Sequence, residues 1–459
     1  MLASLHFARG TRVTPLLGAP TTLDSGDTAW LLAASALVLL MAPGLALFYG
    51  GMVRSKSVLN MMMMTFGSLA AITILWVLVG YSLAFGDDLG GGLIGDPTQY
   101  AGLGQLMEAS SNGSSSVPLI LFAMFQGLFC VITGALVSGA IADRARFGAW
   151  MVFVSVWTLL VYAPVAHWIF DFSAEGHTGG WMANKLGVLD FAGGTAVEIC
   201  SGASALALAL VLGHRVGFGK EAMRPHNLTL VMLGAGLLWF GWFGFNAGSA
   251  LGANQTAAVV FVATLLAGAA GSLGWLALER LRDGHATSLG AASGMVAGLV
   301  AITPSCGSLS PLGSIVMGAV AGVVCALAVG MKYRFGYDDS LDVVGVHLVG
   351  GLVGTLGIGL LATSVAPAGV DGLLYGGGVS QLGKQTLGAG AVLAYAFVVS
   401  GMIGVVVDKL MGFRIDEEHE INGIDLVVHA ETAYDLHATA GARSAGHAIL
   451  GGLTQTEES

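Results

Sequence analysis

Asp190-Phe-Ala-Gly-Gly-Thr-Ala-Val-Glu198 decides the fold of this chain, together with its counterpart Asp339-Ser-Leu-Asp-Val-Val-Gly-Val-His347. Each stretch places an ionisable residue eight positions after an aspartate, in a segment built mainly of small and apolar residues. Eight residues of α-helix rise about 12 Å, close to the middle of a hydrocarbon core about 30 Å thick. If the two segments enter from opposite faces, we expect Glu198 and His347 to meet near the midplane. Ionisable groups at that depth usually mark a substrate or proton pathway; the alternative is that each only satisfies a polar spot between helices.

The composition is that of a polytopic membrane protein. Hydrophobic residues make up 55% of the chain and charged residues 10%, against about 25% charged residues in soluble domains. Glycine accounts for 71 of 459 residues, about twice its ordinary share of about 7%, and small residues let membrane helices pack closely. The four cysteines show no metal-ligand spacing. We expect no metal, no cofactor and no nucleic-acid partner.

The apolar runs predict an all-α multi-pass membrane protein with eleven transmembrane helices. The predicted spans are approximately 28–50, 57–85, 118–142, 147–170, 190–213, 226–250, 256–278, 288–304, 311–331, 341–363 and 387–411. The chain then divides into an N-terminal external segment (1–27), a membrane domain (28–411) and a cytoplasmic C-terminal regulatory tail (412–459). The charge run Asp416-Glu-Glu-His-Glu420 in this tail predicts a solvated segment.

The basic residues predict the orientation. Fourteen of the eighteen Lys and Arg residues lie in the connections after odd-numbered spans or in the tail. The positive-inside rule therefore places the N-terminus outside and the C-terminus in the cytoplasm, which requires an odd number of spans. The fifth and tenth spans then run antiparallel, so the matched aspartate motifs predict a five-plus-five inverted repeat with a site at the repeat interface, and one final helix left over.

Further motifs follow one another along the chain. They are Pro43-Gly-Leu-Ala-Leu-Phe-Tyr-Gly-Gly51, Asp190-Phe-Ala-Gly-Gly-Thr195, Val216-Gly-Phe-Gly-Lys-Glu221 with Pro225-His-Asn227, Gly241-Trp-Phe-Gly-Phe-Asn-Ala-Gly-Ser249, Thr303-Pro-Ser-Cys-Gly307 and Asp342-Val-Val-Gly-Val-His347. In order and spacing they resemble the Amt/Mep/Rh ammonium transporter family, closest to its bacterial Amt branch. The resemblance covers about residues 28–435. It implies eleven helices in a five-plus-five inverted repeat, a homotrimer with one pore in each subunit, and ammonium as the substrate.

The resemblance also assigns an outer ammonium site and the constriction below it. Phe129, in Phe125-Gln-Gly-Leu-Phe129, matches the phenylalanine beneath the site, where an aromatic face can attract a cation. Ser249 matches the hydroxyl that accepts a hydrogen bond from the cation, and Phe245 matches the phenylalanine that closes the pore with Phe129. Asp190 is expected to cap a helix start and shape the site rather than contact the ligand.

Two positions depart from the family pattern. Phe170 stands where the family usually has Trp, so the site would lack an indole N–H donor, unless Trp168 substitutes through a local shift. Glu198 stands where the family generally has the first of two pore histidines, as in some fungal members, and His347 matches the second. Desolvation and a neighbouring imidazolium act on a carboxyl in opposite directions. We therefore expect the pair to titrate as one unit and to provide a proton relay.

The residues and the resemblance together favour ammonium transport. NH4+ would be recruited at the outer site and deprotonated, and NH3 would pass the pore while the proton crosses separately through the Glu198–His347 pair. The alternative is an ammonium sensor that signals through a partner at its tail, because Gly412-Phe-Arg-Ile-Asp-Glu-Glu418 and Ala433-Tyr434 resemble the family tail that docks a PII-type signal protein. A third reading, an intramembrane enzyme, lacks any accompanying nucleophile motif, and we expect no enzyme.

Overall fold

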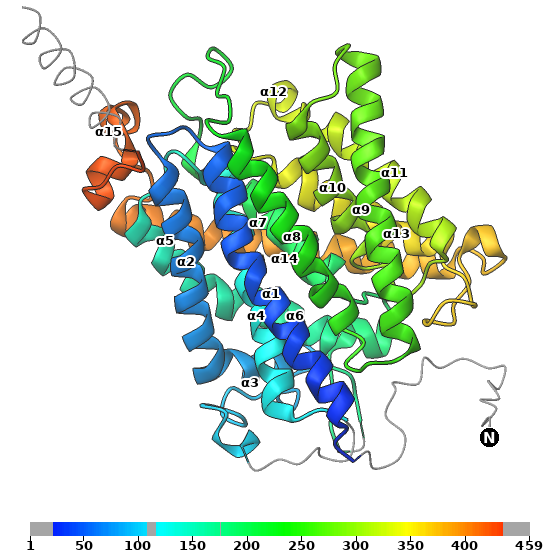
Figure 1. The fold of residues 1–459 in the computed structure, drawn as a ribbon. Coiled ribbons are helices and arrows are strands. Elements are labelled where there is room, and N and C mark those ends of the chain that lie inside the picture. Colours follow the sequence, from blue (N-terminus) through cyan, green and yellow to red (C-terminus); the bar gives the residue numbers. More distant parts are fainter. Residues whose placement is uncertain (1–21, 108–115, 175, 435–459) are drawn as a thin grey trace, which may run out of the picture.

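The computed structural model describes residues 22–107, 116–174 and 176–434, and within these ranges the chain is a helical bundle with three isolated β-bridges and no sheet (Figure 1). The bundle contains eleven apolar helical stretches. They are Ser25–Met52 (α1), Val58–Phe85, Leu119–Ile141, Phe147–Phe170, Gly194–Leu212, Leu228–Gly248 (α8), Gln255–Arg282 (α9), Ser288–Ile302 (α10), Pro311–Phe335, Val344–Leu361 and Ser380–Met411 (α14).

Several stretches are composite. The second stretch consists of α2 (Val58–Leu75), a π turn (Trp76–Gly80) and α3 (Tyr81–Phe85), and the third contains α4 (Leu119–Val137). The fourth consists of α5 (Phe147–Trp157), a π turn (Thr158–Tyr162) and α6 (Ala163–Phe170), and the fifth of the π turn η6 (Gly194–Ile199) and α7 (Cys200–Leu212). The ninth consists of α11 (Pro311–Ala328) and α12 (Met331–Phe335), and the tenth of the π turn η7 (Val344–Leu348) and α13 (Val349–Leu361). The tail adds α15 (Glu417–Asn422).

Each of the eleven predicted spans contains one of these helices. Ten are at least 18 residues long and apolar enough to cross a membrane, while α10 has 15 residues. Nearly all of α10 is buried among α8, α9, α11 and α13. A helix enclosed by its neighbours need not match the full thickness of the hydrocarbon core, because its ends remain in contact with protein.

Helix ends differ from the predicted boundaries by up to seven residues. Helix α1 begins at Ser25, inside the predicted external segment 1–27, because Asp24 Oδ1 accepts a hydrogen bond from the N–H of Asp27 at 2.8 Å and caps the helix there. Helix α14 begins at Ser380, seven residues before the predicted start of the last span at residue 387. Residues 1–21 of the predicted external segment lie outside the described ranges.

Helices α1 and α8 lie side by side across the front of the bundle in Figure 1. Glycines allow the contact. A Cβ added at Gly234 of α8 would lie 2.3 Å from the backbone nitrogen of Phe48, and one added at Gly44 of α1 would lie 3.1 Å from Leu237 Cβ. These two helices are the first and sixth apolar stretches, which correspond in the predicted five-plus-five repeat. Their close pairing follows from the absence of side chains at the crossing.

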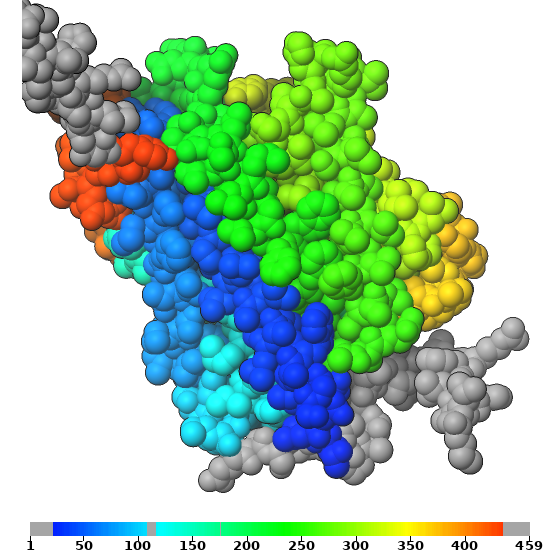
Figure 2. Space-filling model, in the orientation of Figure 1, coloured from blue at the N-terminus to red at the C-terminus, as the bar shows by residue number. Residues whose placement is uncertain are grey.

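The bundle has two ends, which we name by the residues found there. The face that the charge bias predicts to be external, here called the outer face, carries Asp24, the segment 86–107 and residues 171–174 and 176–193, and lies at the bottom of Figure 1 near α3. The tail face carries the connection 53–57, Asp143 and the segment 412–434, and lies at the top near α15. The space-filling view shows the tail, in red and orange, against the upper part of α2 (Figure 2).

The tail is folded onto the bundle, and the prediction of a solvated charge run was wrong for Glu420. This side chain is 1% exposed. Its carboxylate accepts a hydrogen bond from Arg414 at 3.0 Å and from the N–H of Val216 at 2.8 Å, and Arg54 lies 3.6 Å away. A buried carboxylate requires such partners. Asp425 further along the tail accepts from the N–H groups of Leu59 and Asn60 at the start of α2.

Candidate functional site

Glu198 and His347 meet inside the bundle, as the matched motifs predict. His347 Nδ1 lies 2.6 Å from Glu198 Oε2. The two residues are 1% and 5% exposed, and they come from η6 and η7, which contact each other. At this distance the carboxyl and the imidazole form a hydrogen bond, in which one group donates a proton and the other accepts it. The two side chains therefore act as one unit.

Two aspartate caps build this meeting point, each at the start of a π turn. Asp190 Oδ1 accepts from the N–H groups of Gly193 and Gly194 at 2.8 and 2.7 Å, and Oδ2 accepts from Thr195 and Ala196 at 2.7 and 3.3 Å. Asp339 accepts from the N–H groups of Val343 and Val344 at 3.1 and 2.7 Å. Capping satisfies the N–H groups that a helix start leaves free. The π turns therefore begin four residues after Asp190, at Gly194, and five residues after Asp339, at Val344, whereas the predicted spans began at residues 190 and 341.

Glycine at position 351 lets α13 approach η6. A Cβ added at Gly351 would lie 2.9 Å from Glu198 Cβ and 3.0 Å from Ile199 Cγ1. Real Cβ atoms essentially never come closer than 3.0 Å to another heavy atom. Because His347 lies one turn before this glycine on the same helical stretch, the close approach at Gly351 supports the contact between Glu198 and His347.

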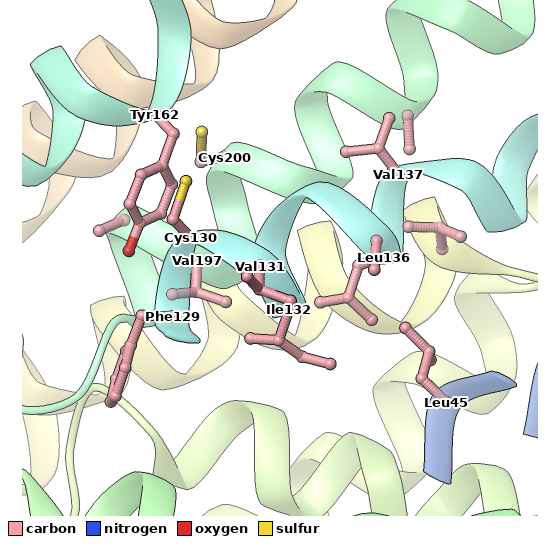
Figure 3. Close-up of a cluster of buried hydrophobic side chains, with 14 of the residues drawn as sticks. Leu45, Phe129, Cys130, Val131, Ile132, Leu136, Val137, Tyr162, Val197 and Cys200 are labelled. Carbon is pink, nitrogen blue, oxygen red and sulfur yellow. The ribbon is translucent and has the colours of Figure 1, made fainter. Parts of the chain in front are cut away.

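A narrow apolar cavity surrounds the pair. It has a volume of about 10 Å³, which is near the lower limit for holding one water molecule. Apart from Glu198 and His347 its lining is hydrophobic: Met41, Leu45, Phe48, Ile132, Leu136, Val197, Leu238, Trp242, Phe245 and Val296. The close-up shows Leu45, Ile132, Leu136 and Val197 pointing toward one another from α1, α4 and η6 (Figure 3). The cavity can accept a small neutral molecule far more readily than a hydrated ion.

Two stacked phenylalanines lie beside this cavity, and one of them, Phe245, lines it. The rings of Phe129 and Phe245 have centroids 4.0 Å apart and planes 17° from parallel, and each residue is 1% exposed. Phe125 packs edge-on against Phe129 with centroids 5.0 Å apart. The sequence-predicted constriction is therefore a contact between two rings from α4 and α8.

Ser249 lies one turn beyond Phe245. Its Oγ is 2.9 Å from the carbonyl oxygen of Phe245 and donates its hydrogen to it. The hydroxyl oxygen keeps its lone pairs and can accept a further hydrogen bond. Asp190 makes the helix cap expected from the sequence, and its four backbone contacts come from the outer end of η6.

Phe170, and not Trp168, lies next to the start of η6. Phe170 Cζ would be 3.5 Å from a Cβ added at Gly193. The indole N–H of Trp168 instead donates to the carbonyl oxygen of Leu93 at 2.8 Å, and its ring packs on Tyr395 with centroids 4.8 Å apart. Trp168 is thus engaged in a separate contact and does not replace the indole that the family pattern places at position 170.

Sequence reasoning did not identify most of the cavity lining. Ile132, Leu136 and Val296 carry no signal, because an apolar side chain facing a pore looks the same in sequence as one facing a neighbouring helix. Trp242 lies within a quoted motif, but nothing in the motif shows that its ring contributes to the cavity wall while its indole N–H donates to Thr303 at 2.8 Å. Among the described residues no group of three or more His, Cys, Asp or Glu side chains could hold a metal ion.

These features define a polytopic membrane protein with a narrow apolar cavity that contains one ionisable pair. The model of the Ammonium Transporter Family matches residues 29–434. The ammonium transporter of Mycobacterium tuberculosis (strain ATCC 25618 / H37Rv) is 55% identical over 448 residues, covering 93% of each chain. The chain therefore belongs to the ammonium transporter family, whose members are transporters and not enzymes.

Solved structures agree with this fold. Mep2 of Saccharomyces cerevisiae has a TM-score of 0.79 and 36% sequence identity, covering 87% of this chain and 89% of that chain. A structure described as a Sensor Amt Protein has a TM-score of 0.80 and 27% identity, covering 88% of this chain and 98% of that chain.

Proposed function

We propose that this chain carries ammonium across the membrane by taking up NH4+ at the outer face, passing NH3 through the pore and moving the proton separately. The hydrogen-bonded pair Glu198–His347, enclosed in an apolar cavity of about 10 Å³, is the observation that carries this proposal. We assign ammonium as the substrate because the chain matches the ammonium transporter family and because its relatives at up to 55% identity are ammonium transporters.

The outer ammonium site is assigned to Phe129, Phe170, Ser249 and Asp190. The free lone pairs of Ser249 Oγ can accept an N–H of the cation, and aromatic faces attract a compact cation electrostatically. Phe170 supplies such a face beside the start of η6 but no N–H donor. Asp190 acts through the four backbone N–H groups that it accepts, which fix the outer end of η6.

Below the outer ammonium site, only neutral ammonia can enter the apolar region at a low cost in free energy. Moving an unpaired ammonium ion into an apolar medium costs many kcal/mol, whereas neutral ammonia loses only hydrogen bonds. The stacked rings of Phe129 and Phe245 must part briefly to admit the molecule, because they leave 4.0 Å between their centroids. Deprotonation above the rings therefore lowers the barrier to passage.

The Glu198–His347 pair supplies two groups that can each hold a proton. When Glu198 receives a proton from the outer side, its hydrogen bond to His347 Nδ1 allows transfer along the pair, and His347 passes it toward the tail face. Net transport is then electrogenic, since one charge crosses for each molecule of ammonia.

We further propose the orientation and the partners. The charge bias supports an N-terminus outside and a C-terminus in the cytoplasm, and the basic residues Arg54, Arg146 and Arg215 lie together with the tail at one end of the bundle. The resemblance supports a homotrimer in the cytoplasmic membrane. The folded tail, anchored through Glu420 and Asp425, supports regulation by a PII-type signal protein that binds there.

An ammonium sensor that signals through this tail is the second candidate. Its support is the likeness to the Sensor Amt Protein structure and the direct anchoring of the tail to the start of α2 through Asp425. Sensing would need binding at the outer site without a pore current.

The test is a solid-supported membrane current from purified protein in liposomes after an ammonium jump. Wild-type protein should give a saturable inward current, and Glu198→Leu and His347→Leu should abolish it. Ser400→Ala serves as the matched control, because Ser400 is also buried and hydrogen-bonded but joins α14 to Ser204 and Trp157 away from the cavity. Full current in both pore variants would eliminate the relay, and bound ammonium without wild-type current would favour the sensor.

A further inference from the structure

Five titratable side chains gather on the outer face where α3 and α6 end. They are Asp87, Asp88, His167, Asp171 and His177. None of them lines the cavity around Glu198 and His347. Their contacts join the segment that follows α3 to the segment that follows α6.

Asp171 lies at the centre of this cluster, between the two histidines. Its Oδ1 is 2.8 Å from His177 Nε2, and its Oδ2 is 3.3 Å from His167 Nδ1. The residue is 5% exposed. Its main-chain carbonyl oxygen also accepts from the N–H of Gly180 and the side-chain amide of Asn184, each at 2.9 Å. Both the side chain and the backbone of Asp171 are therefore fixed in place.

Each histidine holds a second carboxylate. His177 Nδ1 lies 2.6 Å from Asp87 Oδ1, and His167 Nε2 lies 3.4 Å from Asp88 Oδ1. Because both ring nitrogens of His177 face carboxylate oxygens, both must carry hydrogen for both contacts to be favourable. The hydrogen bond that His177 donates to Asp171, together with the charges of Asp171 and Asp87, raises the pKa of His177 to about 9.

Other groups surround the cluster without replacing these contacts. Tyr81 and Tyr100 are the further titratable side chains within electrostatic reach of Asp87 or Asp171. His167 Nδ1 is also 3.1 Å from the carbonyl oxygen of Ala84 at the end of α3. His167 consequently links α6 to α3, and Asp171 links the end of α6 to the segment that carries His177.

The residue immediately before Asp171 is Phe170, the aromatic side chain beside the start of η6. No residue separates them, so any displacement of the Asp171 backbone moves the Cα of Phe170. The contact of Phe170 with Gly193 is only 3.5 Å from ring carbon to the place of a Cβ, and a shift of that order would change how the ring covers the outer end of the pore.

We propose that Asp171 is a positioning residue, which the protonated His177 holds in place so that Phe170 stays over the outer end of the pore, and that the protonation of His177 therefore sets the apparent affinity for ammonium. The inference rests on the proposed function, because it gives Phe170 a role at the outer site. When His177 loses its proton, one ring nitrogen turns a lone pair toward a carboxylate. That contact becomes repulsive, and Phe170 loses its support.

The experiment measures the apparent KM and the maximum of the ammonium-evoked current for full-length protein in liposomes at external pH 7 and pH 10. Each variant is compared with wild type at the same pH and the same calculated NH4+ concentration, so that ammonium speciation cancels. At pH 7, His177→Ala should raise the apparent KM about threefold to tenfold, the size expected when a charge-assisted contact is lost, and should leave the maximum current unchanged. At pH 10 the ratio to wild type should fall to about one, because wild-type His177 is then also neutral.

Conservative and partial variants guard against a folding defect. His177→Arg keeps a cation with several donors and should hold the KM close to wild type at pH 7 and below it at pH 10. Asp87→Asn removes only the more exposed carboxylate of the cluster and should give a smaller change in the same direction. Asp96→Asn is the matched control, since Asp96 is another outer-face aspartate whose side chain is bonded only to Thr98.

The outcomes separate the two proposals. If Phe170→Ala raises the KM but His177→Ala and Asp87→Asn do not, the positioning role is wrong and transport stands. A His177→Ala effect of equal size at both pH values would also overturn it, because a purely structural contact does not follow the protonation of His177. If wild-type protein gives no saturable current, the proposed function and the inference fall together.

Discussion

Replacing Asp190 by alanine should destabilise the protein and abolish its current. The side chain accepts four backbone N–H groups at the start of η6, at 2.8, 2.7, 2.7 and 3.3 Å. Loss of an N-cap costs about 1–2 kcal/mol, and each N–H left buried without a partner costs about 1–3 kcal/mol more. Because Asp190 is only partly buried and water can replace some of the lost bonds, we expect about 2–4 kcal/mol.

Asp24→Ala is the matched control for this prediction. Asp24 caps α1 on the same face, but its side chain is exposed and accepts one hydrogen bond, from the backbone N–H of Asp27 at 2.8 Å. Loss of this cap should therefore cost about 1 kcal/mol. Thermal unfolding of both variants in detergent, followed by tryptophan fluorescence, gives the comparison, and the liposome current gives the functional effect. An Asp190→Ala protein that unfolds no earlier than Asp24→Ala and carries wild-type current would refute the reasoning that the cap places Glu198.

Four further predictions follow from the same geometry. Phe245→Ala should remove the ring stacked on Phe129, widen the constriction and admit larger cations. The measurement is a methylammonium current, which wild type lacks or shows weakly. An unchanged selectivity would show that the two stacked rings do not form the constriction. Gly351→Ala should push α13 from Glu198 at a cost of about 1–3 kcal/mol and reduce the maximum current, whereas Gly236→Ala, at a glycine with open space around its Cβ, should not. Glu420→Ala should remove the partner of Arg414 and of the Val216 N–H at a cost of about 1–3 kcal/mol, release the tail and speed its cleavage by trypsin; equal cleavage rates would show that Glu420 does not anchor it. His177 has a folded-state pKa of about 9, raised from 6.5, so its stabilisation is complete below about pH 6.5 and lost as the pH rises through 9. The unfolding midpoints of wild type and His177→Ala should therefore differ at pH 6 and converge at pH 10, and a constant gap would exclude the linkage.

Much of the architecture could be predicted from the sequence, because the insertion of a segment into a membrane depends on its local composition. A run of about twenty apolar residues has no stable alternative to a helix in a bilayer, since the backbone must satisfy its own hydrogen bonds there. All eleven predicted spans contain a helix for this reason. Helix ends were less predictable: the side chain of Asp24 caps α1 at Ser25, whereas α14 begins at Ser380 without a side-chain cap.

The matched motifs also predicted that Glu198 and His347 would meet, because an equal spacing from two aspartates gives both residues the same depth on antiparallel segments. The sequence did not reveal that both lie in π turns, since these turns depend on the backbone bonds that Asp190 and Asp339 accept. Nor did it show that Glu420, in a run of charges, is buried. That burial depends on Arg414 and Val216, of which the latter lies 204 residues away.

The sequence by itself therefore determined the class of fold, the number of membrane helices and the residues of the ionisable pair, because each depends on composition or on spacing within one segment. Only the tertiary structure decided which aromatic residue stands beside the pore. Trp168 and Phe170 are two positions apart and equally apolar in context. Because they are two residues apart on a helix, they lie on different sides of α6. The indole N–H of Trp168 donates to the carbonyl oxygen of Leu93, 75 residues away, and Phe170 lies next to Gly193. Contacts between distant segments decide which side faces the pore, and no local pattern encodes them.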